Sequence, residues 1–510
     1  MKKIVLLFSV WFLLESCTWV RVFTFFLPSV EDHHIFPRDT ITSEFSPLVF
    51  PSRIDQRIND IENWIPETER LGSQNIVEFL NKTQSTAFVV LRKDTILYEY
   101  YASYHKPQKQ QIIFSVSKSI VNFLAAIAIE EGKMKMEQKV SDFLPEFKSD
   151  QRVDIQIKHL MNMVSGLNAE DKSNLFRLSQ LYYNTNLSKL VRNYDQMIHD
   201  PGSHFAYASH STQILAFCIE KAMQKNLTEL FKEKIFIPLS FECDAYLTLD
   251  TKKNKALRAY GGFALCTKDL LKLGQLMLHR GMYKGRQIVP SFLFDELIHR
   301  TPKEDQWWGY LYGIWRDGYI NESIWEDQDF FAAGFNGQFI YVNPKDSVVI
   351  IRQGLKEPIR FPPLMGRLSA LISQRENDLT VSSNNYADQF EGVYESNYGE
   401  KYEVVQKGIN TLNGEPQWII FKDLNQTLKV KKLFVAQQID GKSIGVNRFS
   451  YFNRAIFKVK EGRVEGMFFD NQRSLELKFF EKKSDLGLNL RKVKLNKIKA
   501  ETNKKVTFEK

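Results

Sequence analysis

The chain has 510 residues, enough for two or more domains, and its 43% hydrophobic and 13% aromatic content indicates a globular protein rather than a disordered one. Its net charge of +9 could suggest a nucleic-acid binder, but six of those net charges lie in the last twenty residues. The rest of the chain is nearly neutral, so no nucleic-acid partner is predicted. The basic tail, 486–510, is interpreted as a solvated end, with a contact to a membrane surface as the alternative.

The first 17 residues have the proportions of an export signal. Two lysines precede the apolar run 4–14, which is too short to span a membrane by itself. The segment that ends in Cys17 resembles a bacterial lipobox, which makes Cys17 a lipidation candidate. Three alternatives stay open: a lipoprotein, an uncleaved anchor that continues through 18–27, and a cleaved soluble protein; Glu15 and Arg21 weigh against the anchor. Each predicts a protein of the bacterial cell envelope, and the first two predict a membrane contact.

The first domain is predicted to begin with a β-hairpin and a helix. Before it, the segment 18–75 is predicted to be a lead-in or tether, because its prolines are too closely spaced for a long regular element. The runs 87–91 and 96–100 are rich in β-branched and aromatic residues and flank a polar turn, which is typical of a hairpin. An apolar stretch over 115–132 then predicts a buried helix with a glycine at its C-terminal end.

Helical patterns dominate the middle of the chain, and strands return at its end. Between about 140 and 300, apolar residues recur at three- and four-residue spacing. Strands are predicted at 338–342 and 347–353, followed by a helix over 363–374. The first domain, 76–375, therefore reads as an α+β fold in which strands open and close the domain.

The last part of the chain has a different pattern of polar and apolar residues. A polar, turn-rich linker over 376–386 is followed by short alternating runs over 387–485, which predict a small antiparallel β domain, either a barrel or a sandwich. The pattern Gly-Lys-Ser-Ile-Gly at 441–445 matches a hydrolase nucleophile elbow. No helix follows it, so it is interpreted as a hairpin turn.

The cysteines and short motifs give no sign of a metal or cofactor. Beyond Cys17 there are Cys218, Cys243 and Cys266, with no CxxC spacing, and three buried thiols are predicted, with one disulfide as the most that could form. The chain has no HExxH motif and no P-loop. No metal and no cofactor are therefore expected.

Lys118 is an unusual residue for its position, near the start of an apolar helix where an ammonium group is costly to bury. It follows Ser115 by three residues, so both side chains lie on one helix face. A desolvated lysine has a lowered pKa and can activate a serine as a nucleophile. A second Ser-x-x-Lys, at 103–106, runs into a proline and lacks a helix. For Ser115 alone, the simpler interpretation is a serine that caps the helix and a lysine that reaches solvent.

The rest of the chain favours the catalytic interpretation. From Ser115 onward it resembles the serine β-lactamase-like superfamily, which contains class C β-lactamases, D-Ala-D-Ala carboxypeptidases and related esterases and amide hydrolases. The resemblance covers about residues 80 to 375 and implies an antiparallel sheet flanked by helices, with a helical subdomain. It rests on segments that occur in the family's order: 114–147, 157–167, 201–220, 260–278 and 334–354.

By resemblance, Tyr207 and Ser209 form the second motif. Tyr207 would be the general base on Ser115, as a phenolate favoured by the Lys118 ammonium. The oxyanion hole would consist of the backbone amides of Ser115 and Gln338. Ser209 would help to bind the substrate.

The third motif departs from the family pattern. Phe335, Asn336 and Gly337 stand where β-lactamases have Lys-Thr-Gly, and these three residues are predicted to contact the substrate. Phe335 removes the cation that would bind a carboxylate, which puts β-lactams and D-Ala-terminated peptides in doubt.

The sequence therefore predicts an envelope-anchored serine hydrolase that cleaves an ester or amide bond of a small molecule or peptide through an acyl-enzyme on Ser115. The alternative is a catalytically weak or inactive binding or sensor lipoprotein with the same fold. Intact Ser115, Lys118 and Tyr207 favour the hydrolase, because a scaffold without activity has no physical reason to keep a buried lysine beside a serine.

Overall fold

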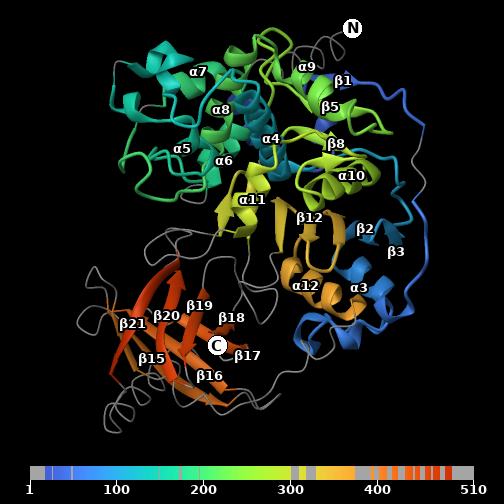
Figure 1. Ribbon diagram of the computed structural model, residues 1–510, viewed down its shortest axis with the longest axis vertical. Helices are drawn as coiled ribbons and strands as arrows, with labels where there is room; N and C mark the ends of the chain where they lie inside the picture. The colour runs from blue at the N-terminus through green and yellow to red at the C-terminus, as the bar shows by residue number, and fades with distance from the viewer. Residues whose placement is uncertain are drawn as a thin grey trace, which may run out of the picture. The chain divides into compact units, whose positions relative to one another are not determined.

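The computed structural model describes residues 18–373, except 26, 47–49, 149, 172–174, 195, 300–308 and 317–328, together with eight strands between residues 392 and 484 (Figure 1). The chain divides into two compact units, the first made mainly of residues up to 375 and the second mainly of residues from 376 onward. Among the described residues, no helix has the length and apolar character needed to cross a membrane.

A seven-stranded antiparallel sheet forms the centre of the first unit. Its strand order is β3-β2-β13-β12-β11-β10-β9, so the first and last parts of the domain pair side by side, with Val90 opposite Ile350. The predicted hairpin is confirmed as β2 and β3. The strands are β2 (Ser85–Arg92), β3 (Thr95–Tyr101), β9 (Tyr310–Leu311), β10 (Ile314–Trp315), β11 (Phe330–Gly334), β12 (Gln338–Asn343) and β13 (Val348–Gly354).

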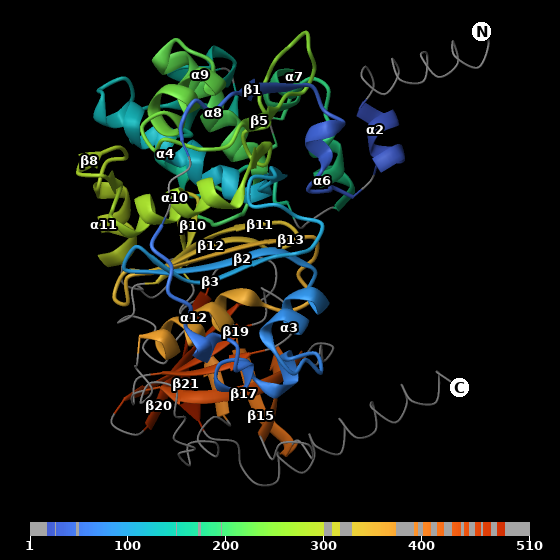
Figure 2. The same cartoon turned by 90° about the vertical axis from the view of Figure 1, so that its right-hand side faces the viewer.

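Helices cover both faces of this sheet. Figure 2 shows α10 (Thr267–Leu278) and α12 (Phe361–Ile372) on opposite faces, which explains why every residue of β12 and β13 is buried. Gly274 of α10 lies against the sheet, where a Cβ atom would come within 2.4 Å of the Val349 side chain. The close approach of helix and sheet therefore depends on glycine at this position.

The helical part of the first unit is built around α4 (Ser117–Glu130) and α8 (Ser209–Met223), which pack against each other. The predicted helix is confirmed with one difference: a 3₁₀ turn, η5 (Phe114–Val116), carries Ser115, and the α-helix begins two residues later. The other helices of this unit are α2 (Thr18–Phe25), α3 (Ile76–Lys82), α5 (Ile157–Met161), α6 (Leu175–Tyr182), α7 (Leu187–Arg192), α9 (Leu227–Phe231) and α11 (Phe292–His299).

A smaller four-stranded sheet joins the N-terminal segment to the site region. Its order is β1 (Arg38–Ile41), β5 (Ala245–Thr248), β6 (Phe263–Leu265) and β4 (Gln111–Ile112), and β4 leads directly into η5. The segment predicted as a lead-in thus contains a strand paired with residues about 200 positions away. Sequence periodicity cannot detect a four-residue strand whose partner is so distant.

The second unit contains a closed antiparallel barrel, one of the two architectures predicted for it. Closure pairs β14 with β21 and leaves no strand edge exposed. Ser443 begins a strand that pairs with the preceding strand of the barrel, which excludes a strand-to-helix nucleophile elbow. The strands are β14 (Gly392–Glu395), β15 (Lys401–Ile409), β16 (Pro416–Lys422), β17 (Lys431–Ile439), β18 (Ser443–Asn447), β19 (Arg454–Lys460), β20 (Arg463–Asp470) and β21 (Leu477–Ser484).

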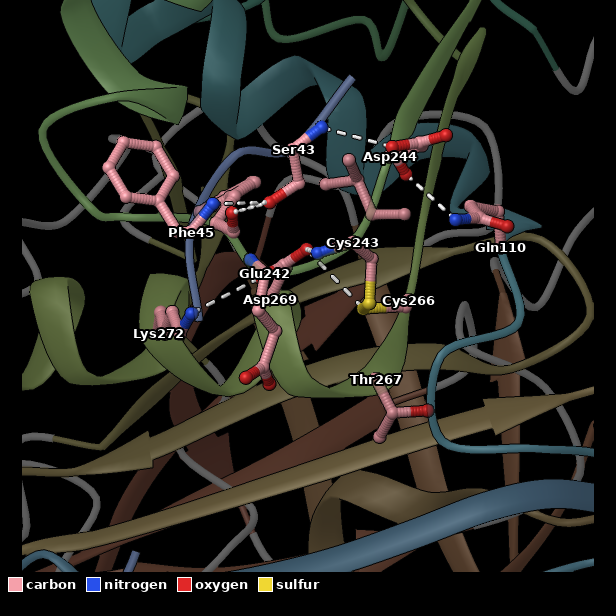
Figure 3. The surroundings of a disulfide bond; sticks show 12 residues. Ser43, Phe45, Gln110, Glu242, Cys243, Asp244, Cys266, Thr267, Asp269 and Lys272 are labelled. Atoms are coloured by element: carbon pink, nitrogen blue, oxygen red, sulfur yellow. Dashed lines mark hydrogen bonds and ion pairs between the residues drawn. A yellow bond between two sulfur atoms is a disulfide. The ribbon is translucent and has the colours of Figure 1, made fainter. Parts of the chain in front are cut away.

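The prediction of three buried thiols is wrong for two of them. Cys243 and Cys266 form a disulfide (Figure 3). Among the cysteines that the structure describes, Cys218 is the one that remains a free, buried thiol. The bond joins the residues just before β5 and just after β6, where antiparallel pairing brings the two Cα atoms to 6.3 Å. Asp269 accepts hydrogen bonds from the backbone amides of Glu242 and Cys243, which holds the same corner together.

Replacing both Cys243 and Cys266 by serine is expected to lower the free energy of unfolding of the first unit by about 3 kcal/mol, because the bond closes a loop with a sequence separation of 23. Denaturant unfolding with and without a reducing agent measures this loss. The control variant Cys218→Ala keeps the bond and should respond to the reducing agent as the wild type does. A wild type whose unfolding is insensitive to reduction would contradict the prediction.

Candidate active site

Ser115 lies on a strained turn between β4 and α4. The preceding residue, Phe114, has φ of +45°, a conformation that a bulky side chain adopts only when its surroundings impose it. The turn is held by a hydrogen bond from the amide of Ile113 to the carbonyl of Phe263 on β6. On the other side, Gly334 of β11 approaches so closely that a Cβ atom there would lie 2.2 Å from the Ile113 carbonyl oxygen. The strands therefore fix the half-buried Ser115 at the sheet edge.

Lys118 is buried beneath the serine. Its side chain is 1% exposed, and its Nζ donates to Ser115 Oγ at 2.8 Å and to the Tyr260 carbonyl oxygen at 3.1 Å. Burial lowers the pKa of Lys118 to about 8, and the nearby Asp171 carboxylate partly opposes this shift. A neutral amine is thus available near neutral pH, and its lone pair can accept the Ser115 proton.

Tyr207 completes the predicted catalytic set. Its ring centroid lies 4.8 Å from Lys118 Nζ, and its hydroxyl forms a hydrogen bond with Ser115. Burial and the Asp171 carboxylate both raise the pKa of Tyr207, and only the hydrogen bond with Ser115 opposes them. The phenolate predicted from sequence is therefore not supported. The structure favours a neutral phenol at Tyr207, and the lowered pKa of Lys118 makes its amine the candidate for the first proton acceptor.

Asp171 was not identified from the sequence, and it organises the second motif. Its carboxylate accepts hydrogen bonds from the Ser209 hydroxyl at 2.6 Å and from the Ser209 amide at 2.8 Å. Its own amide donates to the Tyr207 carbonyl at 3.0 Å. Ser209 follows Tyr207 by two residues, and its hydroxyl donates a hydrogen bond to Asp171. In this structure Ser209 therefore holds the loop that carries Tyr207, and its predicted contact with the substrate stays a prediction.

Aromatic side chains pack around Tyr207. The ring of Trp315 stacks on it at 5.3 Å between centroids, and Tyr310 meets it edge to face at 5.6 Å. Both residues come from the short strands β9 and β10 at the end of the sheet. The aromatic-rich run 307–315 was the one sequence signal that could have indicated these rings beside Tyr207.

The third-motif turn sits beside the nucleophile turn, since β11 and β12 both contact η5. Phe335 is 51% exposed, and its ring packs edge to face on Phe114 at 5.6 Å. Asn336 and Gly337 have φ of +63° and +77°, the left-handed conformation that asparagine and glycine adopt most easily. Gln338, the second predicted oxyanion donor, is the first residue of β12.

A buried arginine supports this turn from behind. Arg352 is 0% exposed, and a Cβ atom on Gly337 would lie 2.0 Å from its Nη1. Its guanidinium donates to the Ser85 hydroxyl and to four backbone carbonyls, those of Thr83, Asn336, Gly337 and Lys356. The positive charge of Arg352 is therefore held by hydrogen-bond acceptors of the protein itself. The lipidation candidate Cys17 lies outside the described residues.

Comparison with known proteins gives the family. The model of the Beta-lactamase family matches residues 73–353, more than half of the chain. The chain belongs to the Beta-lactamase family. The resemblance stated from the sequence and the predicted α+β fold are confirmed, and the protein is a serine hydrolase of β-lactamase-related type.

Two relatives from this comparison share one description. The 6-aminohexanoate-dimer hydrolase of Paenarthrobacter ureafaciens is 23% identical over 291 residues, which cover 54% of this chain and 73% of the relative. The solved structure of a candidate 6-aminohexanoate-dimer hydrolase from Bacillus anthracis is 21% identical, with a TM-score of 0.57, and covers 71% of this chain and 96% of its own. The structural likeness supports the fold of this β-lactamase-family member.

The pH dependence of acylation should report the state of Lys118. Because the base must be neutral and its pKa is lowered to about 8, kcat/KM is expected to rise with pH and to level off above about 8. Rates of ester hydrolysis at substrate concentrations well below KM, measured from pH 6 to 9, give this dependence of kcat/KM on pH. A profile that is flat from pH 6 to 9, or that falls over this range, would contradict Lys118 as the proton acceptor.

Asp171→Asn should move that profile to lower pH. The Asp171 carboxylate raises the pKa of Lys118, so removing its charge lets the amine lose its proton more easily. Ser209→Ala is the matched control, because it removes the hydrogen bond to Asp171 but keeps the charge. It should lower kcat while leaving the midpoint of the profile in place. Equal midpoints for Asp171→Asn and the wild type would show that Asp171 acts only through hydrogen bonds.

Proposed function

We propose that this protein hydrolyses an ester or amide bond through an acyl-enzyme on Ser115. The observation that carries the proposal is the buried Lys118 amine 2.8 Å from Ser115 Oγ, since a lysine with a lowered pKa at this distance is a base for the serine. Ser115 attacks the substrate carbonyl carbon while its proton passes to Lys118. The amides of Ser115 and Gln338 stabilise the oxyanion that forms.

Collapse of this intermediate needs a proton on the leaving group. The Lys118 ammonium formed in the first step returns its proton, and the Tyr207 hydroxyl beside it carries the proton to the leaving alcohol or amine. Water then attacks the acyl-enzyme, gives a proton to the same pair and releases a carboxylic acid and free Ser115. The lysine and tyrosine thus end each cycle as they began it, and no cofactor enters the reaction.

The preferred substrate is proposed to be an ester or amide that does not need a carboxylate to be recognised. Phe335 occupies the third-motif position of the family's cation and is half-exposed, and Arg352 of the same hairpin is buried against backbone carbonyls. Phe335 and the Trp315 ring favour an apolar acyl chain. The curated relative is named a 6-aminohexanoate-dimer hydrolase, which is consistent with an amide substrate. β-Lactams and D-Ala-terminated peptides are proposed to be poor substrates.

The location proposed for the protein is the bacterial cell envelope, with the membrane contacted through residues 1–17. The apolar run in this segment and the lipobox ending in Cys17 support export. The Cys243–Cys266 disulfide is a second, independent support, because such bonds persist mainly in oxidising compartments.

Ser115→Ala is expected to abolish labelling by a fluorophosphonate probe and to reduce hydrolysis of p-nitrophenyl butyrate by about 10³-fold or more. The matched control is Ser103→Ala, which removes the serine of the other Ser-x-x-Lys and should leave both readouts unchanged. Labelling that survives in Ser115→Ala would contradict the nucleophile assignment. A wild type that is labelled but turns over none of the substrates tested would favour the binding or sensor alternative.

Substrate choice is tested with the linear 6-aminohexanoate dimer, p-nitrophenyl butyrate and the β-lactam nitrocefin. We expect kcat/KM for nitrocefin to be at least about tenfold below that for the ester, because the site lacks a charge-assisted partner for the β-lactam carboxylate. Nitrocefin as the fastest of the three would contradict the argument from Phe335.

A further inference from the structure

Helix α2 has an inverted distribution of polar and apolar residues. Its only charged side chain, Arg21, is 2% exposed and donates to the carbonyl oxygen of Asp250 at 3.1 Å. The large apolar side chains Trp19 and Phe23 are 45% and 76% exposed and stack on each other, and Leu27 just beyond the helix is 65% exposed. A surface helix in water normally presents the opposite arrangement.

The inner face of α2 is packed into the domain. Val22 is fully buried in the hydrophobic cluster that also contains Phe114, and the ring of Phe25 stacks on Tyr183 at 5.9 Å. Figure 2 shows α2 beside α6 at the edge of the unit. The exposed apolar face, composed of Trp19 and Phe23 of α2 together with Leu27 just beyond it, is therefore carried by a helix that is fixed to the fold.

We propose that the apolar face of α2 lies in the interfacial layer of a lipid membrane and seats the catalytic domain on it. The inference rests on the envelope location proposed above. The N-terminal segment outside the described residues, 1–17, ends at Cys17, and α2 begins at the next residue. A lipid on Cys17 and an anchor formed by the apolar run 4–14 would each bring Thr18 to the membrane surface. Tryptophan and phenylalanine are the side chains suited to that layer.

The buried position of Arg21 changes how its charge bears on a contact with lipid. In the linear sequence this arginine weighs against an uncleaved anchor through 18–27, because a charged side chain would face lipid. In the fold, the guanidinium points into the domain, and lipid would meet only the exposed apolar face. Helix α2 therefore acts as a seat at the membrane surface and not as part of a spanning segment.

This seat has a consequence for the active site. Phe114, which precedes Ser115, shares a hydrophobic cluster with Val22 of α2. The nucleophile would be held at a set height and orientation above the lipid, and the domain would not swing on a flexible tether. Substrates that partition into the membrane surface would then be presented to the site.

The test measures the protection of single cysteines in membranes that contain the full-length chain. Phe23→Cys is compared with Tyr104→Cys, a control at another exposed site of the same unit with 61% exposure. A membrane-impermeant maleimide is added to sonicated membranes of the expression host, and wild-type labelling is subtracted to correct for Cys17. We expect Phe23→Cys to react at least about tenfold more slowly than Tyr104→Cys, and detergent to remove this difference.

Equal reaction rates in intact membranes, or recovery of the chain in the soluble fraction, would overturn the proposal. Protection that persists in detergent would also overturn it, because it would identify a protein partner or a second copy as the occupant. The same measurement in Ser115→Ala separates this inference from the proposed activity. Its protection should equal that of the active enzyme, whether or not the serine proves to be the nucleophile.

Discussion

The structure of the site depends on one buried contact, that of Lys118 with Ser115 Oγ and the Tyr260 carbonyl. A lysine enclosed to this degree is tolerated because its nitrogen has two polar partners and because its lowered pKa allows it to be neutral. Several backbone features exist to make the enclosure possible. Gly313 is one, since a Cβ atom there would lie 2.8 Å from the Lys118 backbone. The Ser119 hydroxyl donates to the Gly313 carbonyl at 2.7 Å and holds the two segments together.

The proposed mechanism and the one implied by the resemblance differ in the position of one proton, which lies on Tyr207 in the first and on Lys118 in the second. A neutral amine with a phenol and an ammonium with a phenolate contain the same number of protons. Burial disfavours the second arrangement, because it creates two charges in a largely enclosed site, and the Asp171 carboxylate further disfavours a phenolate at Tyr207. Asp171 acts in the other direction on Lys118, whose ammonium form it favours. The carboxylate therefore keeps the amine from losing its proton too readily while it keeps the tyrosine protonated.

Local patterns allowed much of the fold and of the site to be predicted. The hairpin of β2 and β3, the helix carrying Lys118 and the strands of the C-terminal barrel all have periodicities visible within a few residues. Asp171, Arg352 and the disulfide did not emerge, because each acts through a contact between distant parts of the chain. Asp171 meets Ser209 at a separation of 38 residues, and Arg352 meets Ser85 at 267. A single aspartate or arginine carries no local signature of such a role. The direction of the Tyr207 pKa was missed for the same reason, since burial is a property of the folded chain.

The third motif is where this chain departs from the pattern of its family. The resemblance stated from the sequence implies a lysine at the start of this turn in β-lactamases, whose charge would bind a substrate carboxylate. In this chain the turn begins with an exposed phenylalanine, and the cation of the hairpin, Arg352, lies behind the backbone and donates to the Gly337 carbonyl. Gly337 has no side chain and a positive φ, so its backbone can turn sharply against the guanidinium. The arginine thus stabilises the shape of the turn that leads into Gln338, the proposed oxyanion donor, and its charge lies against backbone carbonyls. A site with rigid backbone donors and an apolar rim would select by the shape and polarity of the acyl chain, which is the basis of the proposal that its substrates are neutral esters and amides.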